Sequence, residues 1–187
     1  MAFNLKNINN NWTLFLDRDG VINHEKDNGY IHTWDEFVFY DGVKEAMKIF
    51  AKKFKYILII TNQRGVGKAV TRIEDLYIIH QNMVKEIELA GGRVDHIYFC
   101  TDLDDTSPNR KPQPGMALQA KQDFPDIDFS QSVMVGNTPG DMGFGRNIGA
   151  TTIFLPTTKP EVKHTDSSID AVYPSLAAFA QALQSFR

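Results

Sequence analysis

A stretch near the start of the chain decides the fold: Leu14-Phe15-Leu16-Asp17-Arg18-Asp19-Gly20. Three consecutive apolar residues are followed at once by two carboxylates that flank a single arginine. A short apolar run without polar alternation is typical of a strand that is buried on both faces. Such strands form parallel sheets covered by helices, and ligands bind at the carboxyl ends of these strands. The stretch therefore predicts the first strand of a parallel sheet, with a polar site where that strand ends.

The rest of the chain repeats this alternation of short apolar runs and helical patterns. Further apolar runs occupy residues 57–60, 97–99, 133–135, 153–155 and, more weakly, 169–173. Between them, apolar residues recur at helical spacing over residues 43–54, 73–87, 114–124 and 176–183. Strands that alternate with helices imply right-handed crossovers and a parallel sheet. We therefore expect an α/β fold, a single Rossmann-like domain whose mostly parallel sheet of five to six strands has helices on both faces.

Length and composition limit the classes of protein that fit. With 187 residues the chain has room for one domain, 1–187, without a separate lid, and 42% hydrophobic residues exclude a disordered chain. The net charge of −3 argues against a nucleic-acid partner, and no apolar run is long enough to cross a membrane. Residues 1–11 lack the apolar core of a signal peptide and are expected to be flexible. The lone cysteine, Cys100, favours the reducing cytoplasm, and we expect a monomer.

Residues 21–40 interrupt the alternation, because they follow the first strand without a helical pattern. Two short apolar pieces, residues 30–31 and 37–39, are separated by five more polar positions. This pattern predicts a small β-hairpin flap after strand one that partly covers the end of that strand.

Polar side chains follow four of the predicted strands where each strand ends. They are Asp17 and Asp19, then Thr61 and Asn62, then Arg110 and Lys111, and finally Asn137 and Asp141. Taken singly, each is an ordinary turn, cap or solvated residue. Together they place carboxylates, a hydroxyl, a carboxamide and two cations at one edge of the sheet. The chemistry that fits this set is phosphoryl transfer, which needs a divalent cation and positive groups around the phosphoryl oxygens.

The residue types suggest how the work is divided. Asp17 suits a nucleophile that forms an aspartyl-phosphate, and Asp19 suits a general acid and base for the leaving oxygen and for water. Thr61 and Lys111 can bind the transferring phosphoryl group. Asn137 and Asp141 can help to hold Mg²⁺, which prefers oxygen ligands.

Four strings of residues resemble the four motifs of the haloacid dehalogenase superfamily. They occupy residues 16–23, 61–63, 110–116 and 135–142. The first and third are similar to the capless branch that contains heptose-1,7-bisphosphate 7-phosphatases and histidinol-phosphate phosphatases. The resemblance implies a Mg²⁺-dependent hydrolase of a small phosphorylated metabolite, foremost a heptose bisphosphate and alternatively histidinol phosphate. The alternative from a different functional class is a binding or regulatory module whose catalytic activity is weakened.

The resemblance also implies roles for individual residues. Asp17 would be the nucleophile and Asp19 the general acid and base. Mg²⁺ would be held by the Asp17 side chain, the Asp19 backbone carbonyl and Asn137, with Asp141 close by. Thr61 and Lys111 would bind the phosphoryl group, and Asn62 and Arg110 would position the substrate.

Two departures from the family pattern concern metals. Relatives usually carry Asp where this chain has Asn137, so we expect weaker Mg²⁺ binding. Many relatives also hold a structural Zn²⁺ with cysteines and a histidine. Here the matching positions are Cys100, Asp102, Ser107 and Asn109, and we expect no structural zinc because one thiolate does not make a tetrahedral zinc site.

A third departure adds positive charge to the loop after the second strand. Arg64 and Lys68 stand where relatives often have a different sequence. One hypothesis is that they grip a second phosphate or acidic group of the substrate. The equally weighted alternative is a solvated loop.

Overall fold

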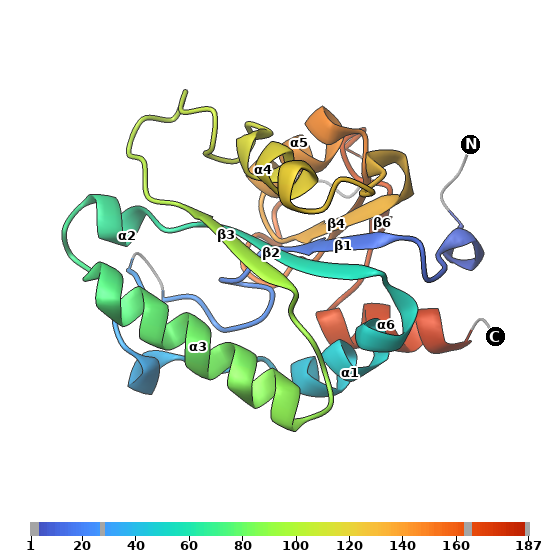
Figure 1. Ribbon diagram of the computed structural model, residues 1–187, viewed down its shortest axis with the longest axis horizontal. Helices are drawn as coiled ribbons and strands as arrows, with labels where there is room; N and C mark the ends of the chain where they lie inside the picture. The colour runs from blue at the N-terminus through green and yellow to red at the C-terminus, as the bar shows by residue number, and fades with distance from the viewer. Residues whose placement is uncertain (1–3, 27–28, 163–165, 186–187) are drawn as a thin grey trace.

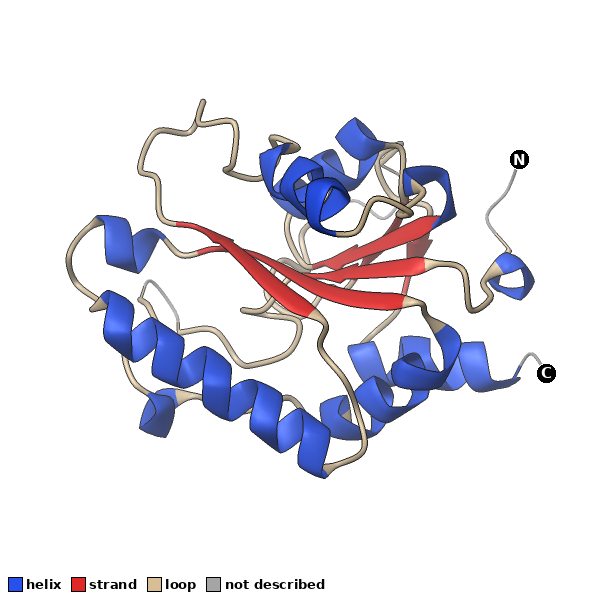
Figure 2. Cartoon of the chain, viewed as in Figure 1, coloured by secondary structure: helices blue, strands red, loops and turns tan. Residues whose placement is uncertain are grey.

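A sheet of six parallel strands lies between two layers of helices (Figures 1 and 2). The computed structural model describes residues 4–26, 29–162 and 166–185. The strands are β1 (Thr13–Leu16), β2 (Tyr56–Asn62), β3 (His96–Cys100), β4 (Ser132–Gly136), β5 (Thr151–Phe154) and β6 (Ala171–Val172). They lie in the order β3-β2-β1-β4-β5-β6 and every neighbouring pair is parallel. The predicted fold class is confirmed, and the weak sixth run contributes a short edge strand.

Two sets of helices cover the two faces of the sheet, as Figure 2 shows. The helices are α1 (Val43–Lys53), α2 (Arg64–Gly67), α3 (Ile73–Leu89), α4 (Gly115–Asp123), α5 (Pro139–Ile148) and α6 (Leu176–Ser185), with 3₁₀ turns η1 (Leu5–Asn7), η2 (Trp34–Glu36) and η3 (Phe129–Gln131). Leu14 and Leu16 of β1 pack with α1, α3 and α6, whereas Phe15 between them packs with α4 and α5. All three are fully buried. Successive strand residues point to opposite faces, so a run without polar alternation fills both cores.

The order of the strands determines where a ligand site can form. From β1 the chain moves outward through β2 to β3, and then returns to the other side of β1 to place β4. In such sheets the crevice opens at the carboxyl ends of the strands where the order reverses. Here that point lies between β1 and β4, and the backbone N–H of Asp17 still donates to the carbonyl of Val135 across it (3.0 Å).

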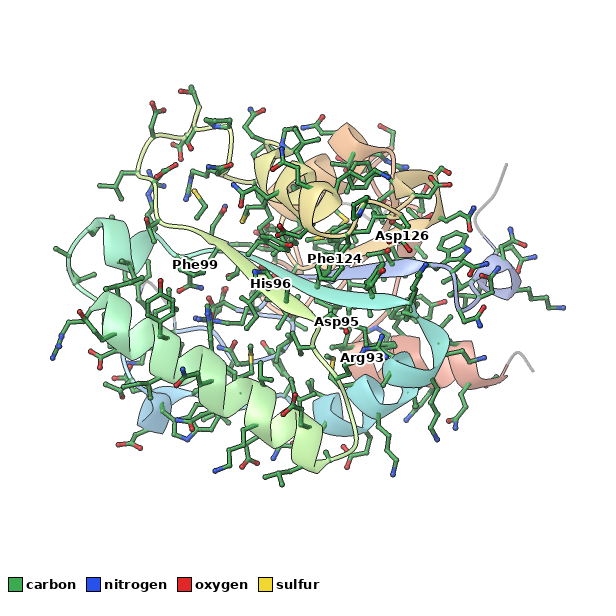
Figure 3. The ribbon with its side chains drawn as sticks, viewed as in Figure 1. Arg93, Asp95, His96, Phe99, Phe124 and Asp126 are labelled. Atoms are coloured by element: carbon green, nitrogen blue, oxygen red, sulfur yellow. The ribbon has the colours of Figure 1, made fainter. Side chains whose placement is uncertain are left out.

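An arginine-centred cluster closes the opposite edge of the sheet (Figure 3). Arg93, just before β3, donates to the Asp95 carboxylate and to three backbone carbonyls that end α1 or follow it. Asp95 in turn accepts from the N–H of Ile57 at the start of β2 (2.7 Å). These hydrogen bonds connect the starts of β2 and β3 to the end of α1.

The predicted β-hairpin between residues 30–31 and 37–39 is wrong. Residues 37–39 lie instead against residues 22–24: Phe39 bridges Asn23, and the N–H of His24 donates to the carbonyl of Val38 (2.9 Å). Residues 34–36 form η2, in which Trp34 stacks on Phe37 with ring centroids 5.0 Å apart. The apolar side chains of this segment serve the core rather than a cross-strand ladder, because both Phe37 and Ile31 are buried.

The amino-terminal segment packs on the body of the protein over its described part. Residues 1–3 lie outside the described residues. Asn4 caps η1 by accepting from the N–H of Lys6 (3.0 Å), and Ile8 and Trp12 are buried in the α1–α6 core. Burial of Ile8 thus anchors this segment, and the flexibility expected for residues 1–11 stays a prediction.

No helix within residues 4–26, 29–162 and 166–185 is long and apolar enough to span a membrane. The same part of the chain contains no separate lid over the carboxyl edge of the sheet, since the six strands, their helices and the connecting loops account for it.

Candidate active site

A cavity of about 530 Å³ lies at the carboxyl ends of the strands. This volume is in the range of small-molecule sites. Six of the predicted site residues line it, namely Asp17, Asp19, Thr61, Asn62, Lys68 and Asp141. The remaining lining residues are Arg18, Glu25, Lys26, Gly29, Tyr30, Ile31, Gln63, Thr138 and Lys159. The structure therefore brings the polar ends of β1, β2 and β4 together, as the sequence predicts.

Lys111 connects two carboxylates beneath the cavity. Its Nζ lies 2.9 Å from Asp17 Oδ1 and 2.6 Å from Asp141 Oδ1, and all three side chains are buried. Although burial disfavours its charge, the carboxylates of Asp141 and Asp17 raise the pKa of Lys111. The lysine is thus a permanent cation at the position where a phosphoryl group bound to Asp17 would need one.

The surroundings of Asp17 favour the protonated form of its carboxyl group despite this lysine. Burial, followed by the nearby Asp141 carboxylate, raises the pKa of Asp17 to about 7, while Lys111 acts in the opposite direction. Its contacts with Lys111 and with the backbone N–H of Arg18 (2.7 Å) both fall on Oδ1. At Asp17, burial and the neighbouring carboxylate therefore outweigh the single lysine.

Asn137 offers an oxygen for a cation. Its side chain is fully buried, its Nδ2 donates to Thr158 Oγ1 (2.6 Å), and its Oδ1 is buried without a hydrogen-bond partner among the described residues. Gly20 packs against it so closely that a Cβ there would lie 2.0 Å from Asn137 Nδ2. With φ at +80°, Gly20 also has the backbone conformation that favours glycine. A buried, unpartnered carbonyl oxygen fits a hard cation.

Both carboxylate oxygens of Asp141 accept hydrogen bonds from other groups of the protein. Its Oδ2 accepts from the N–H of Asn137 (3.1 Å) and from both the N–H (2.9 Å) and Oγ1 (2.7 Å) of Thr138, while Oδ1 accepts from Lys111. With Thr138 it forms the capping box that begins α5. Asp141 was predicted as a metal ligand, but both its oxygens are engaged in holding Lys111 and the end of β4.

Among the described residues, no three His, Cys, Asp or Glu side chains are grouped so as to hold a metal ion. Of the residues that the resemblance assigns to Mg²⁺, Asp17, Asp19 and Asp141 line the cavity, whereas Asn137 is fully buried and does not line it.

Asp19 is held by donors from three residues. Arg18 donates from Nε and Nη2 to Oδ1 (3.2 and 2.8 Å) and from Nη2 to Oδ2 (2.9 Å). Asn23 Nδ2 donates to Oδ1 and Gln63 Nε2 to Oδ2, both at 2.9 Å. Burial opposes ionisation, but the Arg18 guanidinium and these hydrogen bonds outweigh it and keep the pKa of Asp19 below its ordinary value. The carboxylate is fixed in orientation and faces the cavity.

Hydrogen bonds join the end of β2 to Asp19 and to the loop that carries Lys111. Thr61 Oγ1 accepts from Gln63 Nε2 (2.9 Å), so one glutamine connects Thr61 to Asp19. Asn62 exchanges two hydrogen bonds with the backbone of Lys111, at 3.2 and 3.1 Å. Asn62 was predicted to position the substrate. The structure shows that it also positions the loop that carries Lys111.

The other predicted cations divide into two groups. Lys68 lines the cavity, with Nζ 5.4 Å from the centroid of the Tyr30 ring. Arg64 instead donates to the carbonyl of Leu103 (2.8 Å) and lies 3.4 Å from Asp105. Arg110 also pairs with Asp105 (2.9 Å). Neither arginine lines the cavity, because both hold the loop that follows β3.

The side chains at the positions that match the zinc ligands of relatives form hydrogen bonds within the protein. Ser107 Oγ donates to Asp102, and Asn109 Oδ1 accepts from Gln119 Nε2 (3.0 Å). Cys100 is buried at the end of β3, and burial raises the pKa of its thiol. All four matching side chains therefore have protein partners, since Cys100 interacts with Asp102 and Ser107.

Four residues of the site escaped sequence reasoning: Arg18, Asn23, Gln63 and His80. The first three stand inside the recognised motifs, and a charged residue between two carboxylates was a signal that Arg18 had a partner. His80 falls within the predicted helical stretch of residues 73–87, yet its Nε2 lies 3.1 Å from Arg18 Nη1. Nothing in the spacing of His80, 62 positions away, indicates this contact.

The chain is similar to known proteins over most of its length. The family model described as Polynucleotide kinase 3 phosphatase matches residues 13–178. A D-glycero-alpha-D-manno-heptose-1,7-bisphosphate 7-phosphatase of Mycobacterium bovis is 30% identical over 173 residues, covering 92% of this chain and 91% of the relative. The corresponding beta enzyme of Yersinia pestis is 34% identical over 181 residues, covering 91% and 94%.

A solved structure extends the similarity to the whole fold. The D,D-heptose 1,7-bisphosphate phosphatase of B. bronchiseptica, solved with magnesium and phosphate, superposes with a TM-score of 0.84 at 26% identity. The match covers 94% of this chain and 99% of the other. The resemblance drawn from the four motifs is confirmed. The chain belongs to the Polynucleotide kinase 3 phosphatase family of haloacid dehalogenase-like phosphatases.

Proposed function

We propose that this protein is a Mg²⁺-dependent phosphomonoester hydrolase that removes the 7-phosphate of a D-glycero-D-manno-heptose-1,7-bisphosphate. The observation that carries the proposal is the buried pair of Asp17 and Lys111, 2.9 Å apart, in a cavity also lined by Asp19 and Thr61. The names of the M. bovis and Y. pestis relatives support the substrate class. One relative is named for the alpha anomer and the other for the beta anomer, so the proposal covers both.

The reaction proceeds in two displacements. The Asp19 carboxylate takes the proton of the monoanionic phosphoryl group of the incoming ester. An Asp17 oxygen then attacks phosphorus, the bond from phosphorus to the ester oxygen breaks, and Asp19 passes the proton to that oxygen. Water next attacks the aspartyl-phosphate and gives a proton to Asp19, and the bond between phosphorus and Asp17 breaks. Asp19 gives this proton to the leaving phosphate, both aspartates are again carboxylates, and the net products are the alcohol and phosphate. Thr61 donates a hydrogen bond to a phosphoryl oxygen, and Lys111 balances negative charge next to Asp17.

The Asp17 carboxylate, the Asp19 backbone carbonyl and Asn137 Oδ1 are the groups that would hold Mg²⁺. When bound, the ion supplies positive charge for the phosphoryl oxygens. Two of these donors have contacts that support the assignment. Asp17 is fixed by Lys111, and Asn137 is fixed by Thr158 and by the close approach of Gly20.

Three lysines in the lining of the cavity suit a second anionic group. Lys26, Lys68 and Lys159 line the cavity, together with Glu25. Lys26 is paired with Glu36 at 2.6 Å, whereas Lys68 lies over the Tyr30 ring. We assign Lys68 to the second phosphate of the substrate. Arg64 is not assigned to it, because its guanidinium is engaged with the loop after β3.

The test is a phosphatase assay with a matched pair of variants. Wild type, Asp17→Asn and the exposed control Asp35→Asn are compared on p-nitrophenyl phosphate with and without Mg²⁺. We expect turnover that depends on Mg²⁺ and falls by at least about 10³-fold in Asp17→Asn only. Acid-quenched wild type should carry a phosphoryl group on Asp17. If no turnover is lost in Asp17→Asn, or if wild type shows none, a binding or regulatory module is favoured over an enzyme.

A substrate panel tests the finer assignment. It contains both anomers of the heptose bisphosphate, histidinol phosphate and an oligonucleotide with a 3′-phosphate. We expect the highest kcat/KM for a heptose bisphosphate. The oligonucleotide is included because the matching family model carries the description Polynucleotide kinase 3 phosphatase. We expect low activity on it, since the net charge of −3 argues against a nucleic-acid partner. We further propose that the protein acts as a monomer in the cytoplasm, where its buried Cys100 stays reduced.

A further inference from the structure

Arg18 is a buried cation in the middle of the active-site motif. Its side chain is only 1% exposed, although a guanidinium group carries a permanent charge and five N–H donors. A buried group of this kind is stable only where its donors find acceptors. Asp19 accepts from Nε and Nη2, and His80 Nε2 lies 3.1 Å from Nη1. Two acceptors from distant parts of the chain therefore hold one guanidinium.

The contact with Arg18 determines the state of the His80 ring. Arginine can only donate, so His80 Nε2 must be the acceptor and must carry no hydrogen. The ring is then the neutral tautomer with its hydrogen on Nδ1. Burial, followed by the Arg18 charge, lowers the pKa of His80 to about 3. The acceptor is therefore present throughout the pH range in which the protein would work.

His80 is itself held firmly. It lies on α3, whose Leu76, Ile79 and Met83 are fully buried against the sheet. Its ring meets the ring of Phe99, which Figure 3 labels on β3, at a centroid distance of 5.7 Å and an interplanar angle of 62°. The acceptor thus belongs to the rigid helical layer rather than to a loop of the cavity.

We infer that His80 and Arg18 are positioning residues for Asp19: His80 fixes the guanidinium of Arg18, and the guanidinium fixes the Asp19 carboxylate toward the reacting ester oxygen. This inference rests on the proposed function, in which Asp19 is the general acid and base. Arg18 contacts both oxygens of Asp19, whereas Asn23 and Gln63 contact one oxygen each. Loss of the His80 acceptor frees Nη1 to seek another partner, and the Asp19 carboxylate turns with the guanidinium.

A purely structural role makes a different prediction. If His80 only fills space between α3 and the sheet, its replacement lowers stability and leaves kcat unchanged. If His80 positions Asp19, kcat falls while KM, which depends on the phosphate-binding groups, stays nearly constant. Misplacement of a catalytic group by about 1 Å can cost 10²-fold in rate.

The experiment compares His80→Leu, which removes the acceptor, with His80→Gln, whose amide oxygen can replace it. Ile87→Ala, two turns further along α3 and equally buried, is the control for loss of packing. With wild type active on an alkyl phosphate of the substrate panel, whose leaving oxygen needs the proton that Asp19 supplies, we expect His80→Leu to lose about tenfold or more in kcat with KM within about twofold. His80→Gln should recover most of this loss, and Ile87→Ala should keep the wild-type kcat. A His80→Leu variant with wild-type kcat overturns the inference.

A double-mutant cycle tests whether His80 acts through Arg18. Arg18→Lys keeps the charge but cannot reach both Asp19 and His80 with a planar fork. In the Arg18→Lys background, His80→Leu should change kcat by less than about twofold, because the connection is already broken. A full tenfold effect in that background would show that His80 acts by another route and would overturn the inference.

The hydrogen bond itself is tested without any assay of activity. Protein labelled with ¹⁵N-histidine gives ring nitrogen signals, and the one missing in His80→Gln belongs to His80. We expect an unprotonated Nε2 and a protonated Nδ1 from pH 8 to pH 5. The opposite tautomer, or a charged ring at pH 6, overturns the inference. If wild type hydrolyses no phosphoester, the proposed function fails, and this signature still decides whether His80 anchors Arg18.

Discussion

Replacement of His80 by glutamine should change how stability depends on pH. The folded protein keeps His80 neutral, since burial and then the Arg18 charge lower its pKa from 6.5 to about 3. The unfolded chain binds a proton at His80 below pH 6.5, and the folded chain does not. When the unfolded state binds more protons, the free energy of unfolding rises with pH. His80 therefore weakens the folded state as the pH falls below 6.5, and has no such effect above it.

The magnitude follows from the unfolded pKa, as long as the folded value stays well below 5. Between pH 8 and pH 5 the protonation of His80 in the unfolded chain costs the folded state about 2 kcal/mol, calculated as RT ln(1 + 10^1.5). For a domain of this size that equals a shift of about 4–8 °C in Tm. Glutamine does not titrate, so His80→Gln lacks this component.

Urea unfolding of wild type and His80→Gln at pH 8, 7, 6 and 5, at constant ionic strength, measures the effect. Other titrating groups, Asp17 included, are present in both proteins and cancel in the difference. The difference in unfolding free energy, wild type minus variant, should decrease by about 2 kcal/mol from pH 8 to pH 5. A difference that stays constant within about 0.5 kcal/mol would refute the buried neutral histidine, and with it the acceptor role toward Arg18.

Three further predictions concern the charges of the site. Lys111→Met leaves the Asp17 and Asp141 carboxylates without their shared cation, and should cost about 3–5 kcal/mol of unfolding free energy at pH 8, less at pH 5 where protonation of Asp17 relieves the repulsion. Wild-type stability of this variant at pH 8 would contradict the coupling. Asn137→Asp adds a charged donor beside Asp17 and should tighten Mg²⁺ binding roughly tenfold by calorimetry, whereas an unchanged affinity would show that Asn137 is not a ligand. Lys68→Ala should raise KM for a bisphosphate about tenfold with little change in kcat, and Arg64→Ala should leave KM within about twofold, because only Lys68 lines the cavity. Equal effects of the two substitutions would remove the distinction between them.

The sheet could be predicted because its signal is local. Runs such as residues 14–16 and 57–60 are too short for helices and too apolar for loops, so burial on both faces is their only stable use. Once the strands are placed in parallel, their carboxyl ends must meet at one edge. This geometry brings Asp17 and Thr61 together in the cavity, whereas Asn137, directly after β4, is buried outside the lining.

The hairpin could not be predicted in this way, because its signal has two explanations. Phe37 and Phe39 alternate with an exposed Val38, which is the pattern of a half-buried strand. In the structure the same alternation serves contacts with Trp34 and a single bridge to Asn23. Only the position of the neighbouring segments decides between the two.

Partners that are far apart in the sequence were equally inaccessible. Asp141 presents the spacing of a metal ligand, but its oxygens are used by Lys111 and by the start of α5. His80 presents the spacing of a helix residue, but it accepts from a buried arginine. In each case the chemistry depends on a tertiary contact, and a motif specifies residue types without specifying which of them pair.

The cavity divides its lining between two kinds of support. Thr61 stands on β2, Asp17 directly follows β1, and a buried hydrogen bond joins Thr61 to Gln63, whereas Lys26, Tyr30 and Lys159 stand on connecting segments. Substitutions in these segments do not alter the strands that carry the reacting groups. Selectivity for the substrate can therefore be altered separately from the chemistry. A library confined to Glu25, Lys26, Tyr30, Ile31 and Lys159 is the corresponding starting point for redirecting its specificity in the laboratory.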